Sequence, residues 1–269
     1  MNIPSQTTSL TQGRPEQAQQ NTSAGVGLLV RSILAQTRVE LLLTIRRGES
    51  VLITIIVPVV LLVFFASLNI VPTGGRAVDF LLPGMLALAV MATGMVSLGI
   101  ATAYERYYGV LKRLGGSPLP RGGLITAKIA SVLVLEGAQI VLLVGVAVGV
   151  YGWRPQGELA VALLALALGT AAFAGLGLAM AGSLRAEATL AGANGLYLIF
   201  LLLGGVLLPP DHLPAPLEAL ARALPAAALT DALRASMTSG AAFPGSDLIL
   251  LAVWAAIILL VAMRTFRWE

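Results

Sequence analysis

Two polar side chains lie inside an otherwise apolar stretch of the sequence. Glu136 and Gln139 are three residues apart in the run from residue 129 to residue 150. An apolar run of this length is typical of a membrane helix, and Glu136 lies well inside it. Burying a charge there is costly, so we expect Glu136 to be protonated, paired or turned toward a polar cavity. On a helix Gln139 follows one turn later on the same side. Two interpretations stay open: both residues line a substrate path, or both hold helices together through hydrogen bonds.

A second polar pair lies in the apolar run from residue 188 to residue 208. Asn194 and Tyr197 are also three residues apart, so a helix places them on one face. The same two interpretations apply, because a few hydrogen-bonding side chains are common in packed membrane helices.

Residues for catalysis or metal binding are scarce. The chain has no Cys and a single histidine, His212, which excludes thiolate sites and leaves that histidine without an evident metal-binding or triad partner. No GxxxxGK[ST] phosphate loop occurs, and the two lysines, Lys112 and Lys128, do not follow a glycine-rich turn. We therefore expect no ATPase site, no bound cofactor and no enzymatic chemistry on this chain.

The elements that hold these residues are predicted to be membrane helices. The chain has 269 residues, of which 57% are hydrophobic and only 11% are charged, whereas soluble domains carry about 25% charged residues. A helix needs about 20 apolar residues to cross a bilayer. The sequence predicts an all-α integral membrane domain over residues 25–269 with six spans: 51–70, 80–103, 129–150, 159–182, 188–208 and 248–263.

Lysine and arginine predict the orientation of these spans. With both termini in the cytoplasm, only Arg76, Arg154, Arg222 and Arg234 fall in outer segments, and the other basic residues fall in cytoplasmic ones. We interpret the net charge of +4 as a result of this sidedness, and we expect no nucleic-acid partner.

The N-terminal region is predicted to lie outside the bilayer. Residues 1–24 are polar and lack an apolar core, so we expect a disordered tail and no cleaved signal peptide. The segment Val26–Arg47 has a helical period but carries too many charges to span. It is either an interfacial helix on the cytoplasmic leaflet or a simple positive anchor that fixes topology.

Two of the loops between the predicted spans contain residue patterns that predict short helices. In the basic loop Tyr104–Gly123, residues Glu105–Leu114 are predicted to form one short helix that ends at the following glycines and prolines. The mixture of apolar and charged residues suits docking onto a cytosolic partner. In the outer segment, Pro214–Leu224 and Ala226–Met237 are predicted to be short helices separated at Pro225, and to lie at the interface or dip into the leaflet.

Both loops resemble those of one known family. The cytoplasmic loop of ABC-2 type permeases has the pattern ER…G.(L/W)..L..(S/T)PLSR, and this chain is similar to it at Glu105-Arg106, Gly109-Val110-Leu111, Arg113-Leu114 and Ser117-Pro118-Leu119-Pro120-Arg121. The outer run is similar to the family's SG.FFP…LP..L..L…NPLTY.ID.LR stretch at Gly204–Pro209, Leu213-Pro214, Leu224-Pro225 and Thr230–Arg234. Pro120 replaces the usual Ser, Leu224 the usual Asn, and Ala227–Ala228 the usual Leu-Thr region.

The resemblance implies a role for each segment. The group it most resembles is the bacterial drug-exporter permeases of the daunorubicin-resistance type, in the cell membrane. The basic loop would be a coupling helix seated on a separate ATPase subunit, which binds ATP and Mg, and the outer helices would be re-entrant helices at the outer mouth. A second permease copy or a paralogue would complete a dimer in membrane lipid, and transport of a hydrophobic or amphiphilic molecule would be outward. The implied ATPase-coupling residues are Glu105, Arg106, Gly109, Val110, Leu111, Arg113, Leu114, Pro118, Leu119 and Arg121.

Two other functions explain the same sequence. A membrane scaffold subunit without transport activity would also lack catalytic residues. A proton-coupled secondary transporter would use Glu136, although such proteins often show internal repeats and this chain has none that we detect.

Overall fold

The computed structural model describes residues 14–46, 48–68, 76–116, 120–207, 211 and 213–265. All regular secondary structure in the described part is helical, with no β-strand among these residues. In chain order its helices are α1 (Arg14–Arg46), α2 (Gly48–Leu68), α3 (Ala77–Val90), the π-helical η1 (Met91–Ser97), α4 (Leu98–Tyr107), α5 (Val110–Gly115), α6 (Arg121–Tyr151), α7 (Leu159–Ser183), α8 (Ala186–Leu203), α9 (Ala215–Ala223), α10 (Pro225–Met237) and α11 (Gly245–Thr265).

Five helical stretches within the described residues are long and apolar enough to cross a membrane. They are Ala77–Tyr107, Gly122–Tyr151, Leu159–Ser183, Ala186–Leu203 and Gly245–Thr265. The first of these joins α3, η1 and α4 into one continuous helix. The first predicted span corresponds to α2, of which Thr54–Leu68 forms a shorter apolar helix. The all-α membrane fold is confirmed, and the count of six spans stays a prediction.

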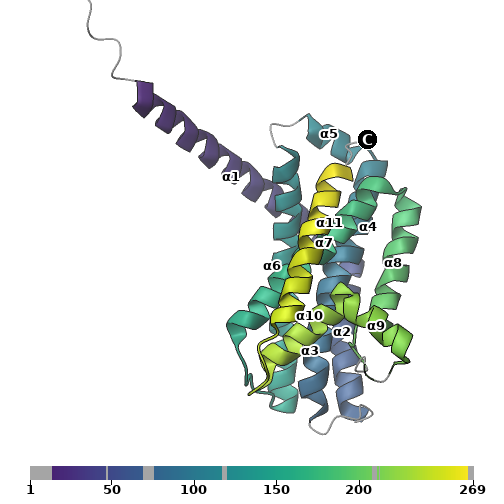
Figure 1. Cartoon of the computed structure of the whole chain (residues 1–269). Helices are drawn as coiled ribbons and strands as arrows, with labels where there is room; N and C mark the ends of the chain where they lie inside the picture. The colour runs from purple at the N-terminus through teal and green to yellow at the C-terminus, as the bar shows by residue number, and fades with distance from the viewer. Residues whose placement is uncertain are drawn as a thin grey trace, which may run out of the picture.

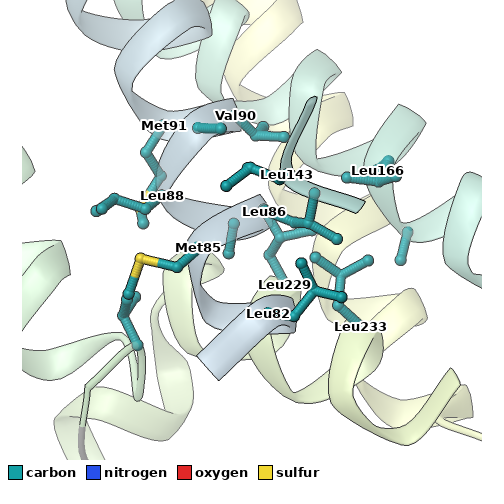
Figure 2. Close-up of a cluster of buried hydrophobic side chains, with 14 of the residues drawn as sticks. Leu82, Met85, Leu86, Leu88, Val90, Met91, Leu143, Leu166, Leu229 and Leu233 are labelled. Atoms are coloured by element: carbon teal, nitrogen blue, oxygen red, sulfur yellow. The ribbon is translucent and has the colours of Figure 1, made fainter. Parts of the chain in front are cut away.

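The continuous helix of α3, η1 and α4 forms the centre of the bundle. Leu82, Met85 and Leu86 of α3 are fully buried. Figure 2 shows these side chains together with Leu143 of α6, Leu166 of α7, and Leu229 and Leu233 of α10, which belong to the same buried cluster. A helix that is apolar on all sides is normally surrounded by other helices, and this position explains why α3 has no polar face.

Glycine allows the central helix to lie against α7 at close range. A Cβ atom added to Gly177 would lie 2.7 Å from the carbonyl oxygen of Met95, and one added to Gly99 would lie 2.9 Å from the Cα of Gly177. Small residues permit this kind of backbone approach in membrane bundles. The contact coincides with η1, where the wider π-helical turn changes the direction of the side chains around it.

The last helix seals the opposite side of α7. A Cβ atom added to Gly175 would lie 3.0 Å from Cγ2 of Ile258, and α11 packs along much of α7. The helices α6, α8 and α11 expose broad apolar faces, in contrast to the central helix. A soluble bundle would cover such faces with charge, so this distribution is typical of helices in contact with lipid.

The N-terminal helix is longer than predicted. Residues 14–24, predicted to be disordered, form the first turns of α1, and residues 1–13 lie outside the described residues. Pro15 is tolerated there because a residue in the first helical turn needs no intrahelical partner for its backbone nitrogen. In Figure 1, α1 projects from the bundle in the half that also carries α5 and the last turns of α11.

The prediction of one helix over Glu105–Leu114 is wrong. The chain ends α4 at Tyr107 and begins α5 at Val110, because Gly109 has a φ of 72°, in the left-handed region that interrupts a right-handed helix.

The two short helices predicted in the outer segment are present as α9 and α10. Pro225 occupies the first position of α10, where its missing N–H is harmless. In Figure 1 these helices lie in the half of the bundle away from α5.

Candidate functional site

A cavity of about 740 Å³ opens beside the central helix. Seven of the described helices contribute to its walls, and α5 does so through Val110. Their lining residues include Glu40 and Leu43 of α1, Thr54 and Val57 of α2, Thr93 and Val96 of η1, Tyr104 and Glu105 of α4, Lys128 and Leu135 of α6, and Asn194 and Tyr197 of α8. The size falls within the range of small-molecule sites, and the mixture of apolar walls with a few polar groups is typical of them.

The predicted pair on α8 lies in this cavity. Asn194 and Tyr197 both line it. The Asn194 amide donates a hydrogen bond to the carbonyl of Leu190 in its own helix, 2.8 Å away. Substrate contact by these residues stays a prediction.

The predicted pair on α6 lies outside the set of residues that line the cavity. Glu136 is buried against α7, where the Thr170 hydroxyl donates to its Oε2 at 2.5 Å. Gln139 turns to other neighbours: its amide donates to the Thr54 carbonyl at 3.1 Å, and its Oε1 accepts from the Thr93 hydroxyl at 2.9 Å. These contacts join helices, as the hydrogen-bonding interpretation expected. Thr54 and Thr93 line the cavity, so Gln139 supports its wall from behind.

A buried ion cluster lies in the wall of the cavity. The Lys128 ammonium is 2.6 Å from Oε2 of Glu105 and 3.0 Å from Oε2 of Glu40. Lys128 is 0% exposed, Glu40 is 6% exposed and Glu105 is 8% exposed. Oε1 of Glu40 also accepts a hydrogen bond from Gln36 at 2.9 Å. The cluster joins α1, α4 and α6.

The sequence contains a signal for this cluster that the topology argument did not use. Glu40 is the one acid in the basic segment from residue 26 to residue 47, and Lys128 directly precedes an apolar run. The sidedness argument counted Lys128 as a basic residue of a cytoplasmic segment and did not use Glu40. A lone acid and a lone lysine at the edges of apolar segments are candidates for a buried pair, because charges there need partners.

The residues predicted to contact an ATPase divide into buried and exposed groups. Glu105 belongs to the ion cluster. Arg106 donates to the carbonyls of Gly182, at 2.7 Å, and Leu184, which ties α4 to the end of α7. Leu111 is buried in a cluster with Leu98 and Leu124.

The exposed group lies around α5. Arg113 is exposed, Val110 borders the cavity and Leu114 is half-buried. Pro118 and Leu119 lie outside the described residues, and Arg121 is described only as the first residue of α6. Contact of any of these residues with an ATPase stays a prediction.

In the half of the bundle away from α5, an arginine on α10 contacts two neighbouring segments. The Arg234 guanidinium lies 3.9 Å from the centre of the Phe80 ring, and it donates to the Gly205 carbonyl at 2.7 Å and to Asp231 at 3.2 Å. Burial raises the pKa of the Asp231 carboxyl, and the charge of Arg234 opposes that rise. Cation–π contact and carbonyl capture together fix α10 on α3 and on the chain after α8.

Comparison with known families decides which proteins this chain resembles. The sequence description of the ABC-2 type transporter family matches residues 31–238, well over half of the chain. This chain belongs to the ABC-2 type transporter family. A search of curated proteins finds no match.

The family match includes every part of the candidate site. The lining residues of the cavity fall between Glu40 and Tyr197, and α5, α9 and α10 also lie within the matched region. As an ABC-2 type membrane domain, the chain is a multi-pass membrane protein. Groups of three or more His, Asp or Glu side chains able to hold a metal are absent from the part of the chain that the structure describes.

Proposed function

We propose that this chain is the permease subunit of an ATP-binding cassette exporter. A separate ATPase subunit, carrying ATP and Mg, would drive it, and the cargo would be a hydrophobic or amphiphilic molecule that moves outward. The observation that carries the proposal is the family match, which covers the residues that line the cavity together with α5, α9 and α10.

The cavity supports the nature of the cargo. Aliphatic side chains form much of its walls, with hydrogen-bonding groups such as Tyr104, Asn194 and Tyr197 between them and the Glu40–Lys128–Glu105 ion cluster to one side. Sites of this kind take ligands with a large apolar surface and few polar groups. A cargo such as a drug, a lipid or a lipid-linked molecule fits this description.

The short helix α5 is the proposed contact with the ATPase. It stands at one end of the bundle (Figure 1) and presents Lys112 and Arg113 to the outside. The neighbouring Tyr107 and Tyr108 are exposed and lie edge to face, with ring centres 5.2 Å apart. Exposed aromatic and arginine side chains together are typical of the centre of a protein interface.

The proposal includes the setting of the chain. We place it in a bacterial cell membrane with six spans, both termini in the cytoplasm, and a second permease copy or paralogue beside it. The bias of lysine and arginine toward the proposed cytoplasmic segments supports the orientation.

Purification of the tagged full-length chain in mild detergent from its own host tests the proposal. We expect an ATPase subunit to co-purify in fixed ratio and the complex to hydrolyse ATP. In proteoliposomes, ATP added on the side of the ATPase should drive a fluorescent lipophilic probe across the membrane. A chain that purifies alone, with ATP-independent behaviour in every assay, would refute the exporter and favour a scaffold subunit.

A further inference from the structure

We propose that Lys128 is a positioning residue that joins α1, α4 and α6 into one mechanical unit, so that displacement of α5 reaches the wall of the cavity. The inference rests on the proposed function. It assigns to Lys128 and Glu40 a role that the family pattern in the loops does not include, and it moves Glu105 from a contact with the ATPase to a contact inside the permease.

Lys128 joins segments that are far apart in the sequence. Its ammonium reaches Glu40 across 88 positions and Glu105 across 23 positions, at 3.0 Å and 2.6 Å. A second link between α1 and α6 lies one turn away, where the Thr37 hydroxyl is 3.4 Å from the Ala127 carbonyl. The three helices therefore meet at a single point through charged groups.

Burial makes this junction resistant to separation. A lysine that only marked the membrane boundary would extend its ammonium into water, but Lys128 is 0% exposed. Separating α1 or α4 from α6 would leave a buried charge without its partner, and removal of one partner from a buried ion pair is strongly destabilising. The helices are thus expected to move together.

The junction is close to α5 along the chain and in space. Glu105 lies two residues before the end of α4, and only Tyr108 and Gly109 separate α4 from Val110, the first residue of α5. Leu111 of α5 is buried in one cluster with Leu98 of α4 and Leu124 of α6. A movement of α5 is therefore passed to the base of both helices.

The same junction forms part of the cavity. Glu40, Glu105 and Lys128 all line it, as does Val110. A displacement of α5 can therefore change the shape of the cavity directly, because the residues that α5 would displace form the cavity wall. This is a contiguous physical connection between two sites, joined by groups that have strong reason to stay in contact.

Distance measurements on the chain alone test the junction. The protein has no cysteine, so spin labels can be placed at Leu34→Cys on α1 and Tyr107→Cys on α4, both at exposed positions. We expect a narrow distance distribution in the background chain and in Lys128→Arg, and a distribution about twice as wide in Lys128→Met, where the charge is lost. Thr170→Val removes a buried polar contact between α6 and α7 and should leave the distribution narrow. An unchanged distribution in Lys128→Met would overturn the inference.

Transport by the assembled complex tests the consequence. In Lys128→Met we expect the flux per ATP hydrolysed to fall by about tenfold, with hydrolysis retained, and Lys128→Arg to keep most of the ratio. A purely structural role would lower assembly, hydrolysis and flux together and leave the ratio unchanged, which would refute the positioning role. Glu105→Gln provides a second, milder variant should Lys128→Met fail to fold. If the wild-type chain binds no ATPase, the proposed function fails, and with it the coupling role, whereas the spin-label distances still decide whether Lys128 joins the helices.

Discussion

Glu136 and Gln139 are three residues apart on α6, yet they form hydrogen bonds with different helices. Glu136 contacts Thr170 of α7, whereas Gln139 contacts Thr54 of α2 and Thr93 of η1. The helical period predicted that the two residues share a side of α6. It did not predict which neighbours they meet, because the packing of α2 and α7 is a property of the whole bundle.

We predict that Glu136 stabilises the α6–α7 contact as a hydrogen-bonding group. The variant Glu136→Gln keeps an oxygen that accepts from Thr170 and should change the melting temperature little. The variant Thr170→Val should lower the free energy of unfolding by about 1 kcal/mol, a magnitude measured for hydrogen bonds between membrane helices. Melting curves in detergent, followed by size-exclusion fluorescence, provide the measurement. A Glu136→Gln protein of normal stability that has lost proton-driven flux would contradict this role and favour a proton-coupled transporter.

At the scale of helices, the local signals in the sequence located the helices better than their ends: α6 begins at Arg121, although the apolar run was read from residue 129. Pro225 separates α9 from α10 as expected, and the apolar runs correspond to helices. The interruption at Gly109 was missed because a single glycine inside a helical pattern can also be tolerated within the helix. The π-helical turn at η1 was also missed; Gly94 of this turn lies close to the backbone of α7, a contact that the local sequence does not reveal.

We predict that the glycine contact between the central helix and α7 tolerates no side chain. In Gly177→Ala the new methyl group would meet backbone atoms of Met95 and Gly94, so the helices must separate, at a cost of about 1–3 kcal/mol. Gly145→Ala on α6 is the matched control, because nothing lies within 4 Å of its added methyl group. Thermal unfolding of both variants in the same detergent measures the difference. Equal melting temperatures would show that the α7 contact is looser than described.

We predict that α5 determines binding of the ATPase through its charge. Arg113→Glu should abolish co-purification of the ATPase, because it reverses an exposed charge in the proposed interface. Arg154→Glu makes the same change at an exposed position between α6 and α7, and it should leave the complex intact. Pull-down yield at several salt concentrations provides the measurement. Normal binding by Arg113→Glu would remove α5 from the interface.

At the scale of the whole molecule, composition was sufficient to predict a membrane bundle but not its cavity. A low fraction of charged residues requires lipid as a solvent for much of the surface. The cavity depends on how α1, α2 and α8 are arranged around the central helix, which no single stretch of sequence encodes. Asn194 and Tyr197 lie in one apolar run, so the sequence alone could propose them as pathway residues. Glu40 and Lys128 come from different helices and meet only in the folded bundle, so their pairing was not predicted.

We predict that filling the cavity blocks transport without harming assembly. Ala101→Trp introduces a large side chain at a lining residue and should lower ATP-driven flux by about tenfold to a hundredfold, because the cargo loses its position. Ile249→Trp, at an exposed position of α11, is the control of equal size. Flux of the fluorescent probe and ATPase co-purification are measured for both. Normal flux in Ala101→Trp would mean that the cargo uses another route.

The region that matches the family is shorter than the region that must fold as one unit, because α11 packs on α7 but lies beyond the match. The family match ends at residue 238, but a chain cut there would lose the helix that covers Gly175 and its neighbours. The face of α7 that α11 covers would then be exposed and lined by small residues, so a helix from another molecule could pack there. The shortest fragment worth expressing therefore extends through Thr265, and a fragment chosen by family boundaries would be expected to associate with itself.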